Sequence, residues 1–105
     1  MKIMFLGTSE IAVPLLKFLL DKKLVCSVVT QNDKPQKRSG QPVSSPVAAA
    51  ALAYMANIYK SSRITDEVYD AIGRQKPDLF IVFAYGVILP AEFIQAFPLG
   101  GINVH

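Results

Sequence analysis

The sequence is poor in the residues that build cross-links and metal centres. It contains one cysteine, one histidine and no tryptophan among 105 residues. Cys26 lies alone in an apolar run, so disulfides and cysteine-based metal sites within the chain are excluded. We expect no metal. A chain of this kind suits a reducing compartment, and we expect a cytoplasmic location.

Long hydrophobic runs and strong charge are also missing. The apolar run at the amino terminus is too short for a signal peptide, and no later run approaches the ~20 residues of a membrane span. We therefore expect a soluble protein without membrane contact. The net charge is only +3, with three basic residues clustered at Lys34, Lys37 and Arg38. Such a cluster suits contact with a phosphate backbone, and a solvated loop is the alternative.

Apolar residues make up 51% of the chain, enough for one domain with a real core. We predict strands at 2–7, 24–30, 57–60, 77–84 and 101–105, alternating with helices that begin near Pro14, Pro46, Ile64 and Ala91. The strands show little apolar/polar alternation, which is typical of parallel sheets covered on both faces. The pattern predicts a Rossmann-like, doubly wound α/β fold with a mainly parallel sheet of about five strands in the order 3-2-1-4-5.

Two features of this fold are unusual. Residues 31–45 form a polar connection that is too long for simple linkage in a compact domain, so we expect it to be mobile or functional. Doubly wound domains usually run to about 150 residues, so we expect this one to be truncated. An apolar face should then stay exposed beside the fifth strand and favour self-association.

The turn after the first strand, Gly7-Thr8-Ser9, lies where a mononucleotide fold would bind phosphate. It has one glycine and neither the dinucleotide fingerprint nor the Walker pattern, which disfavours nicotinamide, flavin and ATP. A tight turn with a hydroxyl helix cap is an equally good interpretation.

Asn103 and His105 occupy the end of the last predicted strand. They are separated by one residue, so on a strand both point to the same side. The carboxyl ends of parallel strands are where open α/β sheets build their sites. An amide and an imidazole held there could stabilise the oxyanion formed when an amine attacks a carbonyl. The alternative is a pair of polar residues at a strand end with no chemical role.

Five segments occur together in one order and with consistent spacing. With them the chain resembles the amino-terminal part of the methionyl-tRNA formyltransferase family. The resemblance covers essentially the whole chain, and the first two segments together distinguish it from the glycinamide ribonucleotide formyltransferases. The segments are Gly7-Thr8-Ser9-Glu10-Ile11-Ala12-Val13-Pro14, Thr30-Gln31-Asn32-Asp33-Lys34-Pro35, Ser45-Pro46-Val47, Ala84-Tyr85-Gly86-Val87-Ile88-Leu89-Pro90 and Gly101-Ile102-Asn103-Val104-His105.

The resemblance implies formyl transfer from 10-formyltetrahydrofolate to the amino group of methionyl initiator tRNA. Asn103 and His105 match the family's catalytic pair. Val87, Ile88 and Leu89 match the segment whose backbone lines the pterin pocket, although their side chains could equally be core. Lys34, Lys37 and Arg38 fall in the loop that approaches the tRNA acceptor end.

The resemblance also implies what is missing. Residues 1–105 correspond to the amino-terminal part of a formyltransferase catalytic domain. A Ser-Leu-Leu-Pro folate segment, a catalytic aspartate and a carboxyl-terminal tRNA-binding domain would follow His105 in the family. We therefore expect these 105 residues to show no appreciable catalysis on their own.

Two other interpretations remain open at the level of sequence. The first is another folate-dependent enzyme of the same fold, such as a sugar-nucleotide formyltransferase or a formyltetrahydrofolate hydrolase. The second is a non-catalytic α/β module that binds a nucleotide or an RNA end.

Overall fold

A five-stranded parallel sheet forms the centre of the computed structural model, which describes residues 1–35 and 40–105. The strands lie in the order β5-β2-β1-β6-β7, and every neighbouring pair is parallel. Counted along the chain this is the order 3-2-1-4-5, which confirms the predicted topology. The bounds are β1 Ile3–Gly7, β2 Val25–Thr30, β5 Ile58–Lys60, β6 Leu79–Phe83 and β7 Gly101–Val104.

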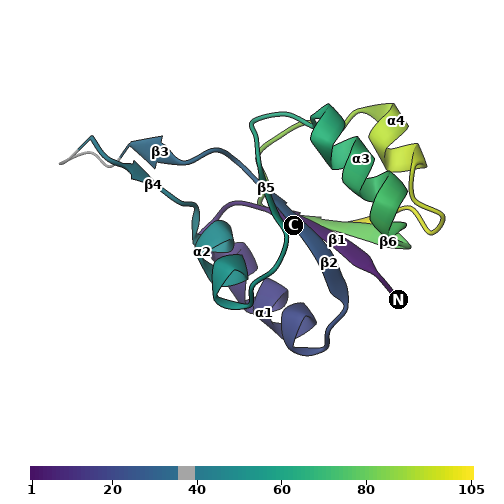
Figure 1. Ribbon diagram of the computed structural model, residues 1–105, viewed down its shortest axis with the longest axis horizontal. Helices are drawn as coiled ribbons and strands as arrows, with labels where there is room; N and C mark the ends of the chain where they lie inside the picture. Colours follow the sequence, from purple (N-terminus) through teal and green to yellow (C-terminus); the bar gives the residue numbers. More distant parts are fainter. Residues whose placement is uncertain (36–39) are drawn as a thin grey trace.

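Helices cover both faces of the sheet. Figure 1 shows α1 (Val13–Asp21) and α2 (Pro46–Ala53) on one face, with α3 (Asp66–Gln75) and α4 (Ala91–Gln95) on the other. A short 3-10 helix, η1 (Glu10–Ala12), leads into α1. The predicted start of α2 is confirmed, because Ser45 Oγ accepts a hydrogen bond from the Ala48 backbone nitrogen at 3.0 Å.

The alternating side chains of the central strands divide the core into two clusters. Met4 and Leu6 pack under α3 and α4 with Phe80, whereas Phe5 and Ile81 pack under α1 and α2. Partners in a parallel register face the same side. Asn103 pairs with Val82 and Val104 with Phe83, so the strand directs Asn103 to the α3–α4 side and Val104 to the other.

An antiparallel hairpin lies inside the connection at residues 31–45. Its strands are β3 (Lys34–Pro35) and β4 (Pro42–Val43), and Figure 1 shows them projecting from the body of the molecule. The sequence pattern predicts only a polar connection here. Strands of two residues are too short to show any periodicity, which is why the pattern does not reveal them. Lys37 and Arg38 lie outside the described residues.

The fifth strand has an apolar residue exposed to solvent, as predicted. Ile102 of β7 is on the α1–α2 side of the sheet, in register with buried Ile81, and it is 52% exposed. In residues 1–35 and 40–105, no helix has the length and apolar character needed to cross a membrane.

Candidate functional site

A pocket of about 560 Å³ opens at the carboxyl ends of β6 and β7. Its walls come from three places: the two strand ends, the turn after β6, and η1. The residues that line it are Ile11, Val82, Phe83, Ala84, Tyr85, Gly86, Val87, Ile88, Asn103, Val104 and His105. We call it the β6–β7 pocket. Its volume lies in the range of about 300–1,000 Å³ that is common for small-molecule sites.

Asn103 and His105 both line the β6–β7 pocket. Both residues are exposed, whereas Val104 between them packs against the core on the opposite side of the sheet. The alternation of the strand therefore brings the amide and the imidazole to one cavity, open to solvent and free to meet a ligand.

The segment Val87 to Leu89 divides between pocket and core. Ile88 is 92% exposed and lines the β6–β7 pocket. Val87 lines the pocket and also packs against the core beneath α3 and α4. Leu89 packs against that core and is not among the lining residues. Val87 and Ile88 therefore share one cavity with Asn103 and His105. Leu89 instead belongs to the core that supports this segment.

Ile11 and Tyr85 are among the lining residues that were not predicted as site residues. Ile11 in η1 is an exposed apolar side chain on the pocket wall. Tyr85 follows β6 and is only 2% exposed, and its Oη has no hydrogen-bond partner among the described residues. Burial raises the pKa of Tyr85 to about 12. Neither position carries a sequence signal of its own, because each depends on how a turn folds back on the strands.

The turn after β6 is fastened to the ends of β1 and β2. The backbone oxygen of Tyr85 accepts hydrogen bonds from Thr8 Oγ1 at 2.9 Å and from Gln31 Nε2 at 2.8 Å. The backbone nitrogen of Thr8 donates to the oxygen of Ala84 at 3.0 Å. Ser9 makes no side-chain capping bond. The Gly7-Thr8-Ser9 segment is therefore a tight turn that joins strand ends, and the predicted hydroxyl cap of the helix is wrong.

Gly86 is needed in this turn for its backbone conformation. Its φ of +81° lies in the left-handed region, which favours glycine. A Cβ atom at this position would also lie 2.6 Å from Gln31 Nε2. The turn that forms the floor of the pocket thus depends on a residue without a side chain.

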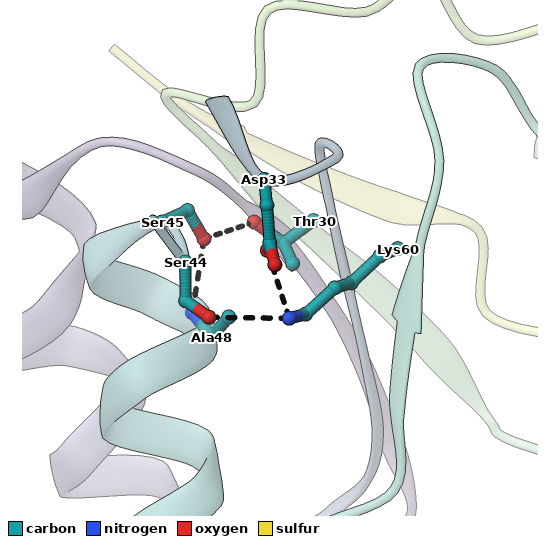
Figure 2. A network of polar contacts seen from close by, with 6 residues as sticks. All are labelled: Thr30, Asp33, Ser44, Ser45, Ala48 and Lys60. Carbon is teal, nitrogen blue, oxygen red and sulfur yellow. Dashed lines mark hydrogen bonds and ion pairs between the residues drawn. The ribbon is translucent and has the colours of Figure 1, made fainter. Parts of the chain in front are cut away.

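Polar contacts close the base of the hairpin, as Figure 2 shows. Lys60 Nζ forms an ion pair with Asp33 Oδ1 at 2.8 Å and donates to Ser44 Oγ at 3.2 Å. The buried hydroxyls of Thr30 and Ser45 lie 2.6 Å apart. Both ends of the hairpin are therefore tied to the sheet and to the start of α2. We call this set of contacts the hairpin clamp.

A second pocket, of about 320 Å³, lies between the hairpin and the turn after β1. We call it the hairpin pocket. Lys34 is the one member of the predicted basic cluster in the described part of the chain, and it lines this pocket. The lining residues are Thr8, Ser9, Asn32, Lys34, Pro35, Val43, Ser44, Ser45 and Pro46. Within residues 1–35 and 40–105, no three His, Cys, Asp or Glu side chains gather as metal ligands.

The chain thus has an open α/β fold with two pockets at the carboxyl ends of its parallel strands, which is where proteins of this class bind ligands. The chain belongs to the formyl transferase family, whose model matches residues 1–105.

Within this family, the chain is similar to proteins of one name. The chain is 41% identical to the methionyl-tRNA formyltransferase of Clostridioides difficile over 107 aligned positions, which cover 100% of the chain and 35% of the relative. It is 39% identical to the protein of the same name from Fervidobacterium nodosum and 38% identical to that from Chlamydia muridarum, with 34% of each covered. The chain thus spans about a third of the length of these relatives.

Proposed function

We propose that residues 1–105 form the amino-terminal part of the catalytic domain of an enzyme that formylates methionyl initiator tRNA, with 10-formyltetrahydrofolate as the donor. The observation that carries the proposal is the placement of Asn103 and His105 in one open pocket, beside the apolar Val87–Ile88 wall. The names of the relatives support the same reaction.

The two polar side chains suit the chemistry of formyl transfer. The neutral amine of methionine attacks the formyl carbon, a new nitrogen–carbon bond forms, and the carbonyl oxygen becomes an oxyanion. The Asn103 amide and the His105 imidazole would donate hydrogen bonds to this oxyanion. The bond from the formyl carbon to the folate nitrogen then breaks, and the amine proton passes to solvent or through the imidazole to the leaving nitrogen.

The apolar wall suits the folate ring system. Ile88 and Ile11 offer exposed aliphatic surface at the pocket, and the backbone of the turn offers polar groups for a ring edge. Val87, Ile88 and Leu89 would form the donor side of the site, with Leu89 acting through its packing against the core.

The hairpin suits an RNA partner. It projects from the body and carries Lys34 at its base, and Lys37 and Arg38 follow Lys34 in the sequence, outside the described residues. Basic side chains at such a position would contact the phosphates of the acceptor end and release counterions. This role would place the enzyme in translation initiation, and therefore in the cytoplasm.

A formylation assay tests the proposal. The full-length protein that contains this chain is incubated with 10-formyltetrahydrofolate and methionyl initiator tRNA, and formylmethionine is measured after hydrolysis of the ester. We expect turnover from that protein and none above background from the 105 residues alone. Release of formate without formylated tRNA would instead support a hydrolase, and binding of both substrates without reaction would support a non-catalytic module.

A further inference from the structure

The backbone oxygen of Tyr85 joins three parts of the chain that are distant in sequence. Thr8 follows β1, Gln31 follows β2 and Tyr85 comes after β6. The Thr8 hydroxyl and the Gln31 Nε2 donate to the Tyr85 oxygen over 2.9 and 2.8 Å. The Gln31 backbone nitrogen donates in turn to the Thr8 hydroxyl at 3.4 Å. These three hydrogen bonds close a ring, which we call the turn anchor.

The turn anchor holds a segment that has little other polar support. Within residues 1–35 and 40–105, the segment from Tyr85 to Leu89 makes no hydrogen bonds except the two that the Tyr85 oxygen accepts. Ala84 has a φ of +51°, which a residue with a Cβ atom adopts only where its surroundings hold it. Val87 and Ile88 follow without an intervening helix or strand. The position of the Val87–Ile88 wall therefore depends on the anchor and on the packing of Val87.

We propose that Gln31 is a positioning residue for the formyl donor, and that it acts through the turn anchor on the Val87–Ile88 wall. This inference rests on the proposed function, because it takes that wall to hold the folate ring system. Gln31 lines neither the β6–β7 pocket nor the hairpin pocket. Its effect on a ligand must therefore pass through the backbone of Tyr85.

The anchor needs an amide at residue 31 and not a carboxylate. The Tyr85 oxygen is a backbone carbonyl and can only accept, so the atom that faces it must carry a hydrogen. Nε2 of Gln31 supplies that hydrogen. A glutamate has the same length, but its ionised carboxylate only accepts, and two acceptor oxygens would then face each other. The Tyr85 oxygen would keep only the bond from Thr8.

Gly86 leaves open the space that the Gln31 amide occupies. A Cβ atom at residue 86 would lie 2.6 Å from Gln31 Nε2, so the amide packs against the backbone of Gly86. Val87 is the next residue in the chain. Asn103, in contrast, lies on β7 and makes no contact with the anchor through hydrogen bonds. A change at Gln31 should therefore act on donor binding and spare the polar side chains.

Steady-state kinetics of the full-length protein that contains this chain tests the inference. We expect Gln31→Glu to raise the KM for 10-formyltetrahydrofolate about fivefold, as loss of one hydrogen bond does. The kcat and the KM for methionyl initiator tRNA should stay within about twofold. Gln95→Glu makes the same change at an exposed residue of α4 that lines neither pocket, and it should leave all three values unchanged.

A second pair of variants tests the anchor from Thr8. Thr8→Val keeps the branched shape and removes the hydroxyl, whereas Thr8→Ser keeps the hydroxyl. We expect Thr8→Val to raise the KM for the donor as Gln31→Glu does, and Thr8→Ser to restore it. Calorimetric binding of 5-formyltetrahydrofolate should follow the same order, which a general loss of stability would not produce.

An unchanged donor KM and folate affinity in Gln31→Glu would overturn the inference. Equal losses in kcat and in the affinities for both substrates would also overturn it, because they mark a structural role alone. The outcome is separable from that of the proposed function. Folate binding that Gln31→Glu weakens, in a full-length protein that does not formylate the tRNA, would remove the function alone. Formylation with a normal donor KM in both Gln31→Glu and Thr8→Val would remove the role of the anchor alone.

Discussion

The ring of Phe80 occupies the space where residue 101 would carry a side chain. A Cβ atom built on Gly101 would lie 2.0 Å from Phe80 Cζ, far closer than two carbon atoms can approach. Phe80 in β6 is the register partner of Gly101 in β7, and its ring packs among Phe93 and Phe97 with centroid separations of 5.3 and 5.0 Å. Glycine at 101 therefore lets β7, the strand that carries Asn103, pair closely with β6.

Gly101→Ala should destabilise the protein. The added methyl group must displace an aromatic ring inside a packed cluster, which typically costs about 1–3 kcal/mol. Gly73→Ala is the matched control, because a methyl group on Gly73 in α3 would meet no neighbouring element within 4 Å. The free energy of unfolding of that control should rise by about 0.5–1 kcal/mol, because alanine stabilises a helix relative to glycine. Urea unfolding followed by circular dichroism measures both.

A second substitution distinguishes the ring clash from a backbone effect. If the Phe80 ring is the obstacle, Phe80→Leu should lower the free energy of unfolding much less in the Gly101→Ala background than in the unaltered protein. Strictly additive losses in the double variant would show that the ring is not what excludes a side chain at 101.

Tyr85→Phe should stabilise the protein. The Tyr85 hydroxyl is buried without a partner in the described chain, and an unsatisfied buried polar group costs about 1–3 kcal/mol. Its removal leaves the backbone hydrogen bonds of the turn in place. Thermal unfolding at neutral pH should show a higher melting temperature, and a lower one would mean that the hydroxyl has a partner.

The same residue predicts a stability change at alkaline pH. The pKa of Tyr85 is about 12 in the folded protein, against 10.0 for an ordinary tyrosine, because burial disfavours the phenolate. The unfolded chain therefore loses this proton first. The free energy of unfolding is therefore unaffected by this group below pH ~10 and falls as the pH rises toward ~12, by about 1.4 kcal/mol per pH unit at most. Tyr85→Phe lacks this titration, so its advantage over the wild type in urea unfolding should widen across the interval. A constant difference between the two proteins would contradict the raised pKa.

Asn103→Ala and His105→Ala should abolish most formylation in the full-length protein without unfolding it. Loss of one oxyanion donor typically lowers kcat by about 10²–10³-fold. Both side chains are exposed, so the free energy of unfolding should change by no more than about 0.5 kcal/mol. Gln95→Ala, at an exposed residue of α4, provides a control for activity. Full activity in either site variant would remove that residue from the proposed chemistry.

Lys60→Ala should make local opening of the hairpin easier and have little effect on the free energy of unfolding of the whole domain. The ion pair with Asp33 is about one-third exposed on each side, with side-chain values of 37% and 34%, and such pairs contribute only about 0–1 kcal/mol. Hydrogen exchange at the hairpin amides, Lys34 and Val43, should accelerate several-fold while that of β1 is unchanged. Lys17→Ala, an exposed lysine of α1, should leave both unaffected.

The topology of the sheet follows directly from residue patterns in the sequence. Runs such as Val25–Thr30 lack apolar/polar alternation because both faces of β2 are covered, and that absence identifies a parallel sheet. The helix expected from Ile64 begins instead at Asp66, since the Thr65 hydroxyl accepts from the Val68 nitrogen and caps it. Ile64 is buried ahead of the cap, so its periodic position belongs to packing outside the helix.

The candidate site was only partly predictable. Asn103 and His105 could be recognised because a two-residue period on a strand fixes their side. Ile11 and Tyr85 could not, because their places in the pocket come from turns whose shape depends on contacts far along the chain, such as that from Thr8 to Tyr85. The hairpin pocket forms only when β3, β4 and the start of α2 come together, so no local sequence pattern predicts it.

The hairpin clamp has a consequence for how such chains can diversify. Asp33 and Ser44 both bind the Nζ atom of Lys60. The two ends of the span between them therefore stay close together, whatever the sequence of that span. Doubling the length of a closed flexible loop costs only about 0.6 kcal/mol. Insertions, deletions or a grafted peptide between these two residues should thus leave the scaffold intact, which makes this arm a natural place for new partner preferences to arise.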